Sequence, residues 1–258
     1  MPQYCSPLSY TSDNLTNKEL GWKTEFFNHR LQWNGAIYQE NWDNVQVDFF
    51  DPAVLGNVGF GANGPDYRIR GAEMSLVAAL TRGLTAQGAI SWNSSVQTNA
   101  PQLIANNPDL LNDPATSGEY GQPILSVVNP YGPKGGTSPN SPPRQYNLRL
   151  RYEWTQGNYH SHLQAGCSYT AHSFTQSSAN PSLSSGSNVS TTLLRFENPA
   201  ITQFDAAIGI ARDAWTAELM AHNLTNVIKS TYTSTNQFVV AETITRPRVI
   251  GIEVGYKF

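Results

Sequence analysis

The sequence predicts an all-β protein, an antiparallel portion of a transmembrane β-barrel, and three observations lead to that prediction. Charged residues make up only 14% of the 258 residues, whereas aromatic residues make up 11%. Apolar and polar residues alternate in about nine segments of the chain. The links between these segments are alternately short and long, as are the turns and loops of outer-membrane barrels.

Composition narrows the class of protein. A soluble domain carries about 25% charged residues, so this chain is short of charge, yet its mean hydropathy of -0.39 is modest. Low charge, modest hydropathy and many aromatic residues are together typical of a wall with one apolar and one polar face. The net charge of -3 and the lack of a basic run do not favour a nucleic-acid partner.

The final segment shows the alternation most clearly. From Ile250 to Phe258, apolar side chains occupy every second position, and Gly, Glu or Lys occupy the others. Successive side chains of a strand point to opposite sides of the sheet, so this strand has an apolar and a polar face. The same alternation predicts strands at 20–27, 31–38, 72–78, 84–93, 146–154, 159–169, 203–210 and 215–222.

The links between the expected strands predict their orientation. Tight links fall at 28–30, 81–83, 156–158 and 212–214, and long links rich in Gly, Pro, Asn and Ser fall at 44–66, 96–142, 174–199 and 227–245. A transmembrane barrel has short periplasmic turns and long extracellular loops. On this pattern we expect the chain to end on the periplasmic side, with 96–142 as an outer loop long enough to indicate function or disorder.

Five short motifs resemble those of TonB-dependent outer-membrane receptors. They are Asn14-Leu15-Thr16-Asn17-Lys18-Glu19-Leu20-Gly21-Trp22-Lys23, Trp42-Asp43-Asn44-Val45-Gln46, Arg70-Gly71-Ala72-Glu73 with Gly83-Leu84, Trp215 with Asn223-Leu224-Thr225-Asn226, and Arg246-Pro247-Arg248 with the terminal Phe258. Each motif is degenerate alone, but their order and spacing from Asn14 to Phe258 are those of the receptor family. The resemblance covers nearly the whole chain.

The resemblance implies a fold and a domain assignment. It implies that residues 1–258 are the C-terminal portion of the β-barrel domain, about nine strands of the 22-stranded wall of plugged transporters. The plug domain and the N-terminal strands of the family have no counterpart in the sequence. The residues after Met1 also lack the basic and apolar regions of a signal peptide, so we expect the true N-terminus to lie upstream.

The resemblance also implies a function. The family is not enzymatic, and the implied role is a barrel segment for active uptake of a scarce or bulky nutrient of the siderophore, cobalamin or oligosaccharide class, incomplete on its own. No cofactor is implied. The implied partners are outer-membrane lipid, the barrel assembly machinery, the TonB complex through the missing plug, and a small-molecule substrate. The implied location is the outer membrane of a Gram-negative bacterium.

Candidate ligand-binding residues lie in the expected outer loops, because loops on a rigid scaffold carry recognition. They are Trp42, Asp43, Tyr120, Tyr131 and Lys134. At the other end of the molecule, the terminal aromatic residue with alternating apolar residues resembles the signal read by the barrel assembly machinery. That signal would comprise Val254, Tyr256 and Phe258.

A second group of candidates shares the polar face of two adjacent strands. These residues, expected to face the lumen, are Arg149, Arg151, Glu153, His160 and His162. On the resemblance they would contact the plug or line the substrate route; otherwise they form an ordinary cross-strand charge ladder. The two imidazoles would lie about 7 Å apart along one strand, but we expect a polar wall and no metal site.

Two alternatives from other classes stay open at this point. One is a self-contained small porin or adhesin barrel in the outer membrane. The other is a soluble, secreted, β-rich ligand-binding domain, which would have to cover the apolar faces of its strands. No motif of a catalytic nucleophile, phosphate loop or zinc protease is present.

Overall fold

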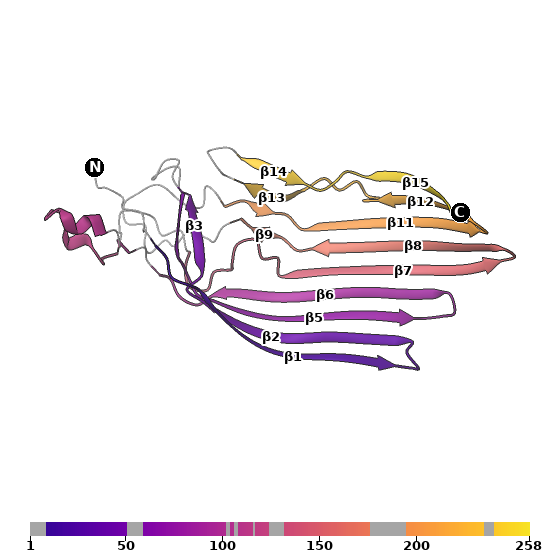
Figure 1. Ribbon diagram of the computed structural model, residues 1–258, viewed down its shortest axis with the longest axis horizontal. Helices are drawn as coiled ribbons and strands as arrows, with labels where there is room; N and C mark the ends of the chain where they lie inside the picture. Colours follow the sequence, from indigo (N-terminus) through magenta and orange to yellow (C-terminus); the bar gives the residue numbers. More distant parts are fainter. Residues whose placement is uncertain are drawn as a thin grey trace.

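The computed structural model describes residues 9–50, 59–101, 104–105, 108–115, 117–123, 132–175, 195–234 and 240–258. Its main strands are β1 (Asn14–Phe26), β2 (Leu31–Asp43), β5 (Tyr67–Ala79), β6 (Leu84–Gln97), β7 (Arg144–Gln156), β8 (Tyr159–Thr170), β11 (Ile201–Arg212), β12 (Trp215–His222) and β15 (Val249–Tyr256). They form one nine-stranded antiparallel sheet in chain order (Figure 1). All nine expected strands are therefore confirmed.

Several strands are longer than the sequence pattern predicts. Strand β1 begins at Asn14 rather than at Leu20, and β5 begins at Tyr67 rather than at Ala72. The added residues continue the ladder, since Asn14 is the partner of Asp43 and Tyr67 is the partner of Trp42. Backbone hydrogen bonds do not require apolar side chains, so the alternation marks only the apolar part of each strand.

Turns and loops lie at opposite ends of the sheet (Figure 1). The strands are joined in pairs by tight links at 27–30, 80–83, 157–158 and 213–214. Gly157 and Asp213 take the left-handed backbone conformation there, which fits the sharp reversals of hairpin turns. The C-terminus lies at this turn end, as expected (Figure 1).

The long links contain small elements that the sequence pattern does not indicate. These are the strands β3 (Gln46–Phe50), β4 (Gly59–Asn63), β9 (Ser173–Phe174), β10 (Glu197–Asn198), β13 (Ser230–Ser234) and β14 (Ala241–Ile244), and the 3-10 helices η1 (Pro108–Asn112) and η2 (Ser117–Glu119). The strands pair two by two as β3–β4, β9–β10 and β13–β14. Within the described ranges, no helix is long and apolar enough to span a bilayer.

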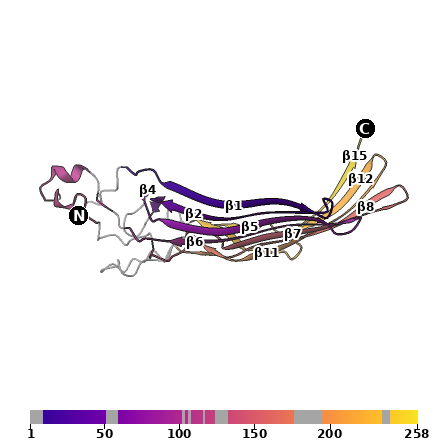
Figure 2. The same ribbon diagram turned by 90° about the horizontal axis from the view of Figure 1, so that it is seen from below.

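One face of the sheet is apolar across all nine strands. Two of its cross-strand rows are Leu20–Ile37–Ala72–Trp92 and Tyr152–Leu163–Ile208–Leu219–Ile252. Among the residues that the structure describes, no second layer covers it, as the edge-on view in Figure 2 shows, and Ile252 is 76% exposed. Soluble monomers rarely expose continuous apolar patches beyond a few hundred Å², so this face is suited to contact with lipid or with another apolar surface.

The opposite face is polar and concave. A hollow of about 820 Å³ lies over it and is lined from strands β1 to β8, with Glu19, Lys23, Glu73 and Gln145 among its polar residues. The sheet bends around this side (Figure 2). Within the described sheet, the edge strands β1 and β15 each have one partner strand, so the wall is not closed.

Candidate functional site

Strands β7 and β8 bring the five candidate lumen residues onto the polar face. Glu153 lies opposite His162, Arg151 opposite Gln164, and Thr155 opposite His160. The side chains two positions apart along each strand follow the same side, which is the face opposite Leu148 and Leu163. The structure therefore places these charged and imidazole side chains on one face of two neighbouring strands.

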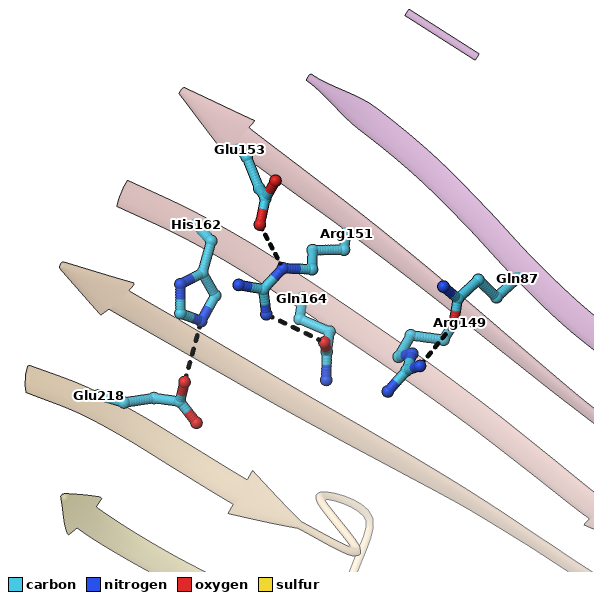
Figure 3. Close-up of polar contacts among 7 residues, drawn as sticks. All are labelled: Gln87, Arg149, Arg151, Glu153, His162, Gln164 and Glu218. Carbon is cyan, nitrogen blue, oxygen red and sulfur yellow. Dashed lines mark hydrogen bonds and ion pairs between the residues drawn. The ribbon is translucent and has the colours of Figure 1, made fainter. Parts of the chain in front are cut away.

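Arg149 and Arg151 of β7 contact acceptors on this face (Figure 3). Arg151 donates from Nε to Oε1 of Glu153 at 2.8 Å and from Nη1 to Oε1 of Gln164 at 3.4 Å. Arg149 donates to Gln87 on β6. The side chains of Arg151 and Glu153 are 38% and 63% exposed, so their ion pair contributes little stability. It sets the direction of the guanidinium instead.

His162 reaches past its neighbouring strand. Its Nε2 lies 3.0 Å from Oε2 of Glu218 on β12, although β11 lies between the two strands (Figure 3). The residue of β11 beneath the ring is Gly209, where an added Cβ would lie 2.2 Å from Cε1 of the imidazole. The missing side chain of Gly209 therefore makes room for the bridge.

The two histidines do not converge on one point. Nδ1 of His160 lies 3.1 Å from Oγ1 of Thr155 on β7, whereas His162 turns towards β12. Among the described residues, no group of three or more His, Cys, Asp or Glu side chains is placed to hold a metal ion. The arrangement is a chain of polar contacts along the wall.

The candidate ligand residues occupy separate places at the loop end. Trp42 and Asp43 are the last residues of β2, and Trp42 donates from Nε1 to Oδ2 of Asp13 at 2.7 Å. Tyr120 follows η2 and Lys134 lies in the turn before β7, both exposed. No hydrogen bond or ion pair in the described structure joins these four residues. Tyr131 lies outside the described residues.

Gln97, at the end of β6, anchors the segment that carries Lys134. Its side chain is fully buried, and its Nε2 donates to the carbonyl oxygens of Asn99 at 2.9 Å and Gly132 at 3.0 Å. Its backbone pairs with Gly135 and Gly136. Sequence reasoning missed Gln97, because a glutamine at the end of an alternating strand gives no sign of burial.

The three residues of the expected assembly signal lie on the apolar face. The ring of Tyr256 contacts Trp215 on β12 at a centroid distance of 4.7 Å, and Phe258 contacts Tyr256 at 5.1 Å. Phe258 is otherwise fully exposed, and Val254 is 62% exposed. This leaves an apolar, aromatic edge along β15, the last strand of the sheet.

These features together define a class of protein. A single curved sheet has an exposed apolar face, a polar concave face, tight turns at one end and long loops at the other. This is the architecture of the wall of a transmembrane β-barrel, in which one face contacts lipid and the other an aqueous interior.

Comparison with known families identifies the family within this class of protein. The family model described as "TonB dependent receptor-like, beta-barrel" matches residues 11–224. The chain therefore belongs to the TonB-dependent receptor family, as the sequence motifs indicated. Proteins of this family are transporters rather than enzymes, and they reside in the outer membranes of Gram-negative bacteria.

Solved structures share the fold. The ferric yersiniabactin uptake receptor FyuA of Yersinia pestis has a TM-score of 0.64 at 12% identity, over 95% of this chain and 30% of that chain. The siderophore receptor PiuA of Acinetobacter baumannii has 0.63 at 17%, over 95% and 28%. The copper transporter OprC has 0.57 at 11%, over 95% and 31%.

The chain thus spans about three-tenths of the length of the receptors that it resembles. Identities this low show that the fold is shared; they do not indicate that the substrate is. The search of curated proteins found no match.

Proposed function

We propose that this chain forms the C-terminal part of the wall of an outer-membrane receptor that takes up a scarce or bulky nutrient with energy delivered through TonB. The observation that carries the proposal is the nine-stranded sheet with an uncovered apolar face, in a chain matched by the receptor family over residues 11–224. Outer-membrane lipid would cover that face, and the polar face would line the lumen.

The direction of the edge strands supports a wall completed by further strands. Both β1 and β15 run from the loop end to the turn end (Figure 1). Joining them directly would make a parallel pair in an antiparallel wall, which disfavours a self-contained barrel. An odd number of additional strands restores the alternation; for a barrel of 22 strands, the nine strands here leave 22 - 9 = 13. A soluble domain is disfavoured because no second sheet of the described part of the chain covers the apolar face.

The substrate would enter from the loop end. Trp42, Asp43, Tyr120, Tyr131 and Lys134 remain the proposed contacts, and Arg149, Arg151, Glu153, His160 and His162 would face the plug or the substrate route. The plug, and through it the TonB complex, would come from sequence outside this chain. Val254, Tyr256 and Phe258 would be read by the barrel assembly machinery.

For the substrate we propose the siderophore class first, with cobalamin and oligosaccharides as the other classes to test. The support is that two similar structures are described as a ferric yersiniabactin uptake receptor and a siderophore receptor. A copper transporter shares the same fold, so the fold alone does not select the cargo.

Uptake by cells tests the proposal. Cells with and without the gene would be given radiolabelled ferric siderophores, cobalamin or an oligosaccharide, each with and without an uncoupler of the inner-membrane proton gradient. We expect one substrate class to enter only in cells that carry the gene, and only without uncoupler. Uptake that is gene-dependent but insensitive to the uncoupler would favour a passive porin and contradict the proposal.

A further inference from the structure

A row of polar side chains, two of them basic, lies on the apolar face, just beyond the outer edge of its apolar part. In register across β1, β2, β5 and β6, this row is Lys18–Gln39–Arg70–Ser94. It directly follows the apolar row Leu20–Ile37–Ala72–Trp92. Residues two apart in a strand share a face, so these polar side chains point away from the concave side, as their apolar neighbours do.

Two further cations adjoin this row. Arg68 is the partner of Asn41 one row further out, and Arg144 of β7 is the partner of Trp92. We call Lys18, Arg68, Arg70 and Arg144 the outer basic patch. All of them are exposed, and within the described structure none forms an ion pair. Arg70 donates from Nε to Oε1 of Gln39 at 2.8 Å, which holds its guanidinium over β2.

Nearby carboxylates lie further out than the patch. Asp43 shares the face but ends β2, opposite Asn14. Asp66 precedes β5 and accepts hydrogen bonds from the backbone N–H of Asn44 at 2.7 Å and from Nδ2 of Asn99 at 2.6 Å. The positive charge of the patch is therefore left without a partner at the level of the apolar edge.

The patch stands out because the same face lacks charged side chains between the patch and the turn end on six strands. On β1, β2, β5, β6, β7 and β8, the outward positions between the patch and the turn end carry no charged side chain. Trp92, which is 47% exposed, marks the boundary, as interfacial aromatic residues do in membrane proteins. The patch thus lies at the height of lipid headgroups, on the side where lipid rather than substrate would be.

The geometry points to a binding site for the phosphate groups of a phosphorylated glycolipid in the outer leaflet. This inference rests on the proposed placement of the loop end outside the cell. Arginine binds phosphate with two parallel hydrogen bonds. Arg68 and Arg70 are about 7 Å apart along β5, and Lys18 and Arg70 about 10 Å apart across two strand spacings, so the patch can contact more than one phosphate. Gln39, Asn41 and Ser94 supply hydrogen-bonding groups for sugar hydroxyls.

Lipid binding by the purified receptor tests the site. The receptor that contains this chain would be extracted from outer membranes, and its affinity for bisphosphorylated lipid A and for dephosphorylated lipid A measured in detergent micelles. The test variant is Lys18→Gln with Arg68→Gln and Arg70→Gln. The matched control, Lys23→Gln with Arg149→Gln and Arg151→Gln, removes the same charge from the polar face. A third variant, Lys18→Arg with Arg68→Lys and Arg70→Lys, keeps the charge.

We expect a large loss of affinity for bisphosphorylated lipid A in the test variant and not in the matched control. The test variant should bind bisphosphorylated lipid A about a hundredfold more weakly, since each basic residue at an anionic membrane surface changes affinity about fivefold. The control variant should bind like the wild type. The charge-keeping variant should lose much less affinity than the test variant, since it loses only the paired hydrogen bonds of Arg68 and Arg70. Dephosphorylated lipid A should bind weakly to all, and excess inorganic phosphate should compete poorly. Equal affinity of the test variant and wild type, or equal affinity for dephosphorylated lipid, would overturn the site.

Mobility on unheated gels reports whether each protein is folded. A folded wild-type receptor that shows no difference between the lipids would overturn the glycolipid site alone. A wild-type chain that never reaches the outer membrane would overturn the proposed function, and the site with it.

Discussion

The imidazole of His162 lies directly over the backbone of Gly209, in the space that a Cβ would occupy. This position lets Nε2 of His162 meet Glu218 at 3.0 Å across an intervening strand. The contact links β8, β11 and β12 on the polar face. In the proposed barrel it would stiffen the lumen wall close to the turn end.

Gly209→Ala tests this arrangement. The new methyl group would displace the imidazole, and loss of its hydrogen bond should lower the free energy of unfolding by about 1 kcal/mol. Denaturant unfolding of the assembled receptor measures the change. In a His162→Ala background there is no ring to displace, so Gly209→Ala should no longer lower the free energy of unfolding. Gly251→Ala is the matched control, because the nearest atom to its added Cβ is 3.7 Å away; equal losses at both glycines would contradict the account.

Gly35 tests packing on the apolar face. A Cβ there would lie 2.4 Å from Cζ2 of Trp22 and 2.8 Å from the carbonyl oxygen of Glu73. Because backbone cannot move aside easily, Gly35→Ala should destabilise the wall by about 1–3 kcal/mol. The yield of folded receptor in the outer membrane gives the measurement. Gly21→Ala, whose nearest contact is 3.5 Å, should be tolerated, and a full yield for Gly35→Ala would show that Trp22 is not fixed over this glycine.

Gln97 tests the anchoring of the loop that carries Lys134. Gln97→Ala removes two hydrogen bonds from a buried side chain, at a cost of about 2 kcal/mol. The amides of Gly135 and Gly136 should then exchange with solvent much faster, as followed by hydrogen exchange. Lys134→Ala, at an exposed position, should leave that exchange unchanged. Unaltered exchange in Gln97→Ala would mean that the segment is held by other contacts.

Phe258 tests the expected assembly signal. The ring of Phe258 contacts Tyr256 and is otherwise exposed, so Phe258→Ala should change the stability of the folded protein little. Its assembly into the outer membrane should fall severalfold, because the terminal aromatic residue would be read before the wall closes. Pulse labelling followed by unheated gel mobility measures the rate. Lys257→Ala is the neighbouring control, and equal rates for wild type and Phe258→Ala would exclude this role.

The sheet could be predicted because the alternation within each strand distinguishes its apolar face from its polar face. Alternation from Tyr146 to Trp154 or from Ile250 to Phe258 identifies a strand without reference to its neighbours, and the lengths of the links order the hairpins. The small strand pairs could not be predicted. Ser230–Ser234 and Ala241–Ile244 lack alternation, and only their mutual pairing makes them strands.

The candidate site was predictable only in part. The shared face of Arg151, Glu153 and His162 follows from parity along two adjacent strands. The bridge from His162 to Glu218 does not, because it depends on the register of a third strand that places Gly209 between them. The same holds for the outer basic patch, since Lys18 and Arg70 are far apart in sequence and only the pairing of β1, β2 and β5 brings them together.

The orientation of the chain in the outer membrane is the central claim, and labelling of single cysteines in intact cells tests it most directly. In a background where Cys5 and Cys167 are serine, one variant would carry Lys134→Cys at the loop end and another Asn158→Cys at the turn end. A membrane-impermeant maleimide should label the first in intact cells, and the second only after the outer membrane is permeabilised. Labelling of Asn158→Cys in intact cells, or protection of Lys134→Cys, would contradict the account.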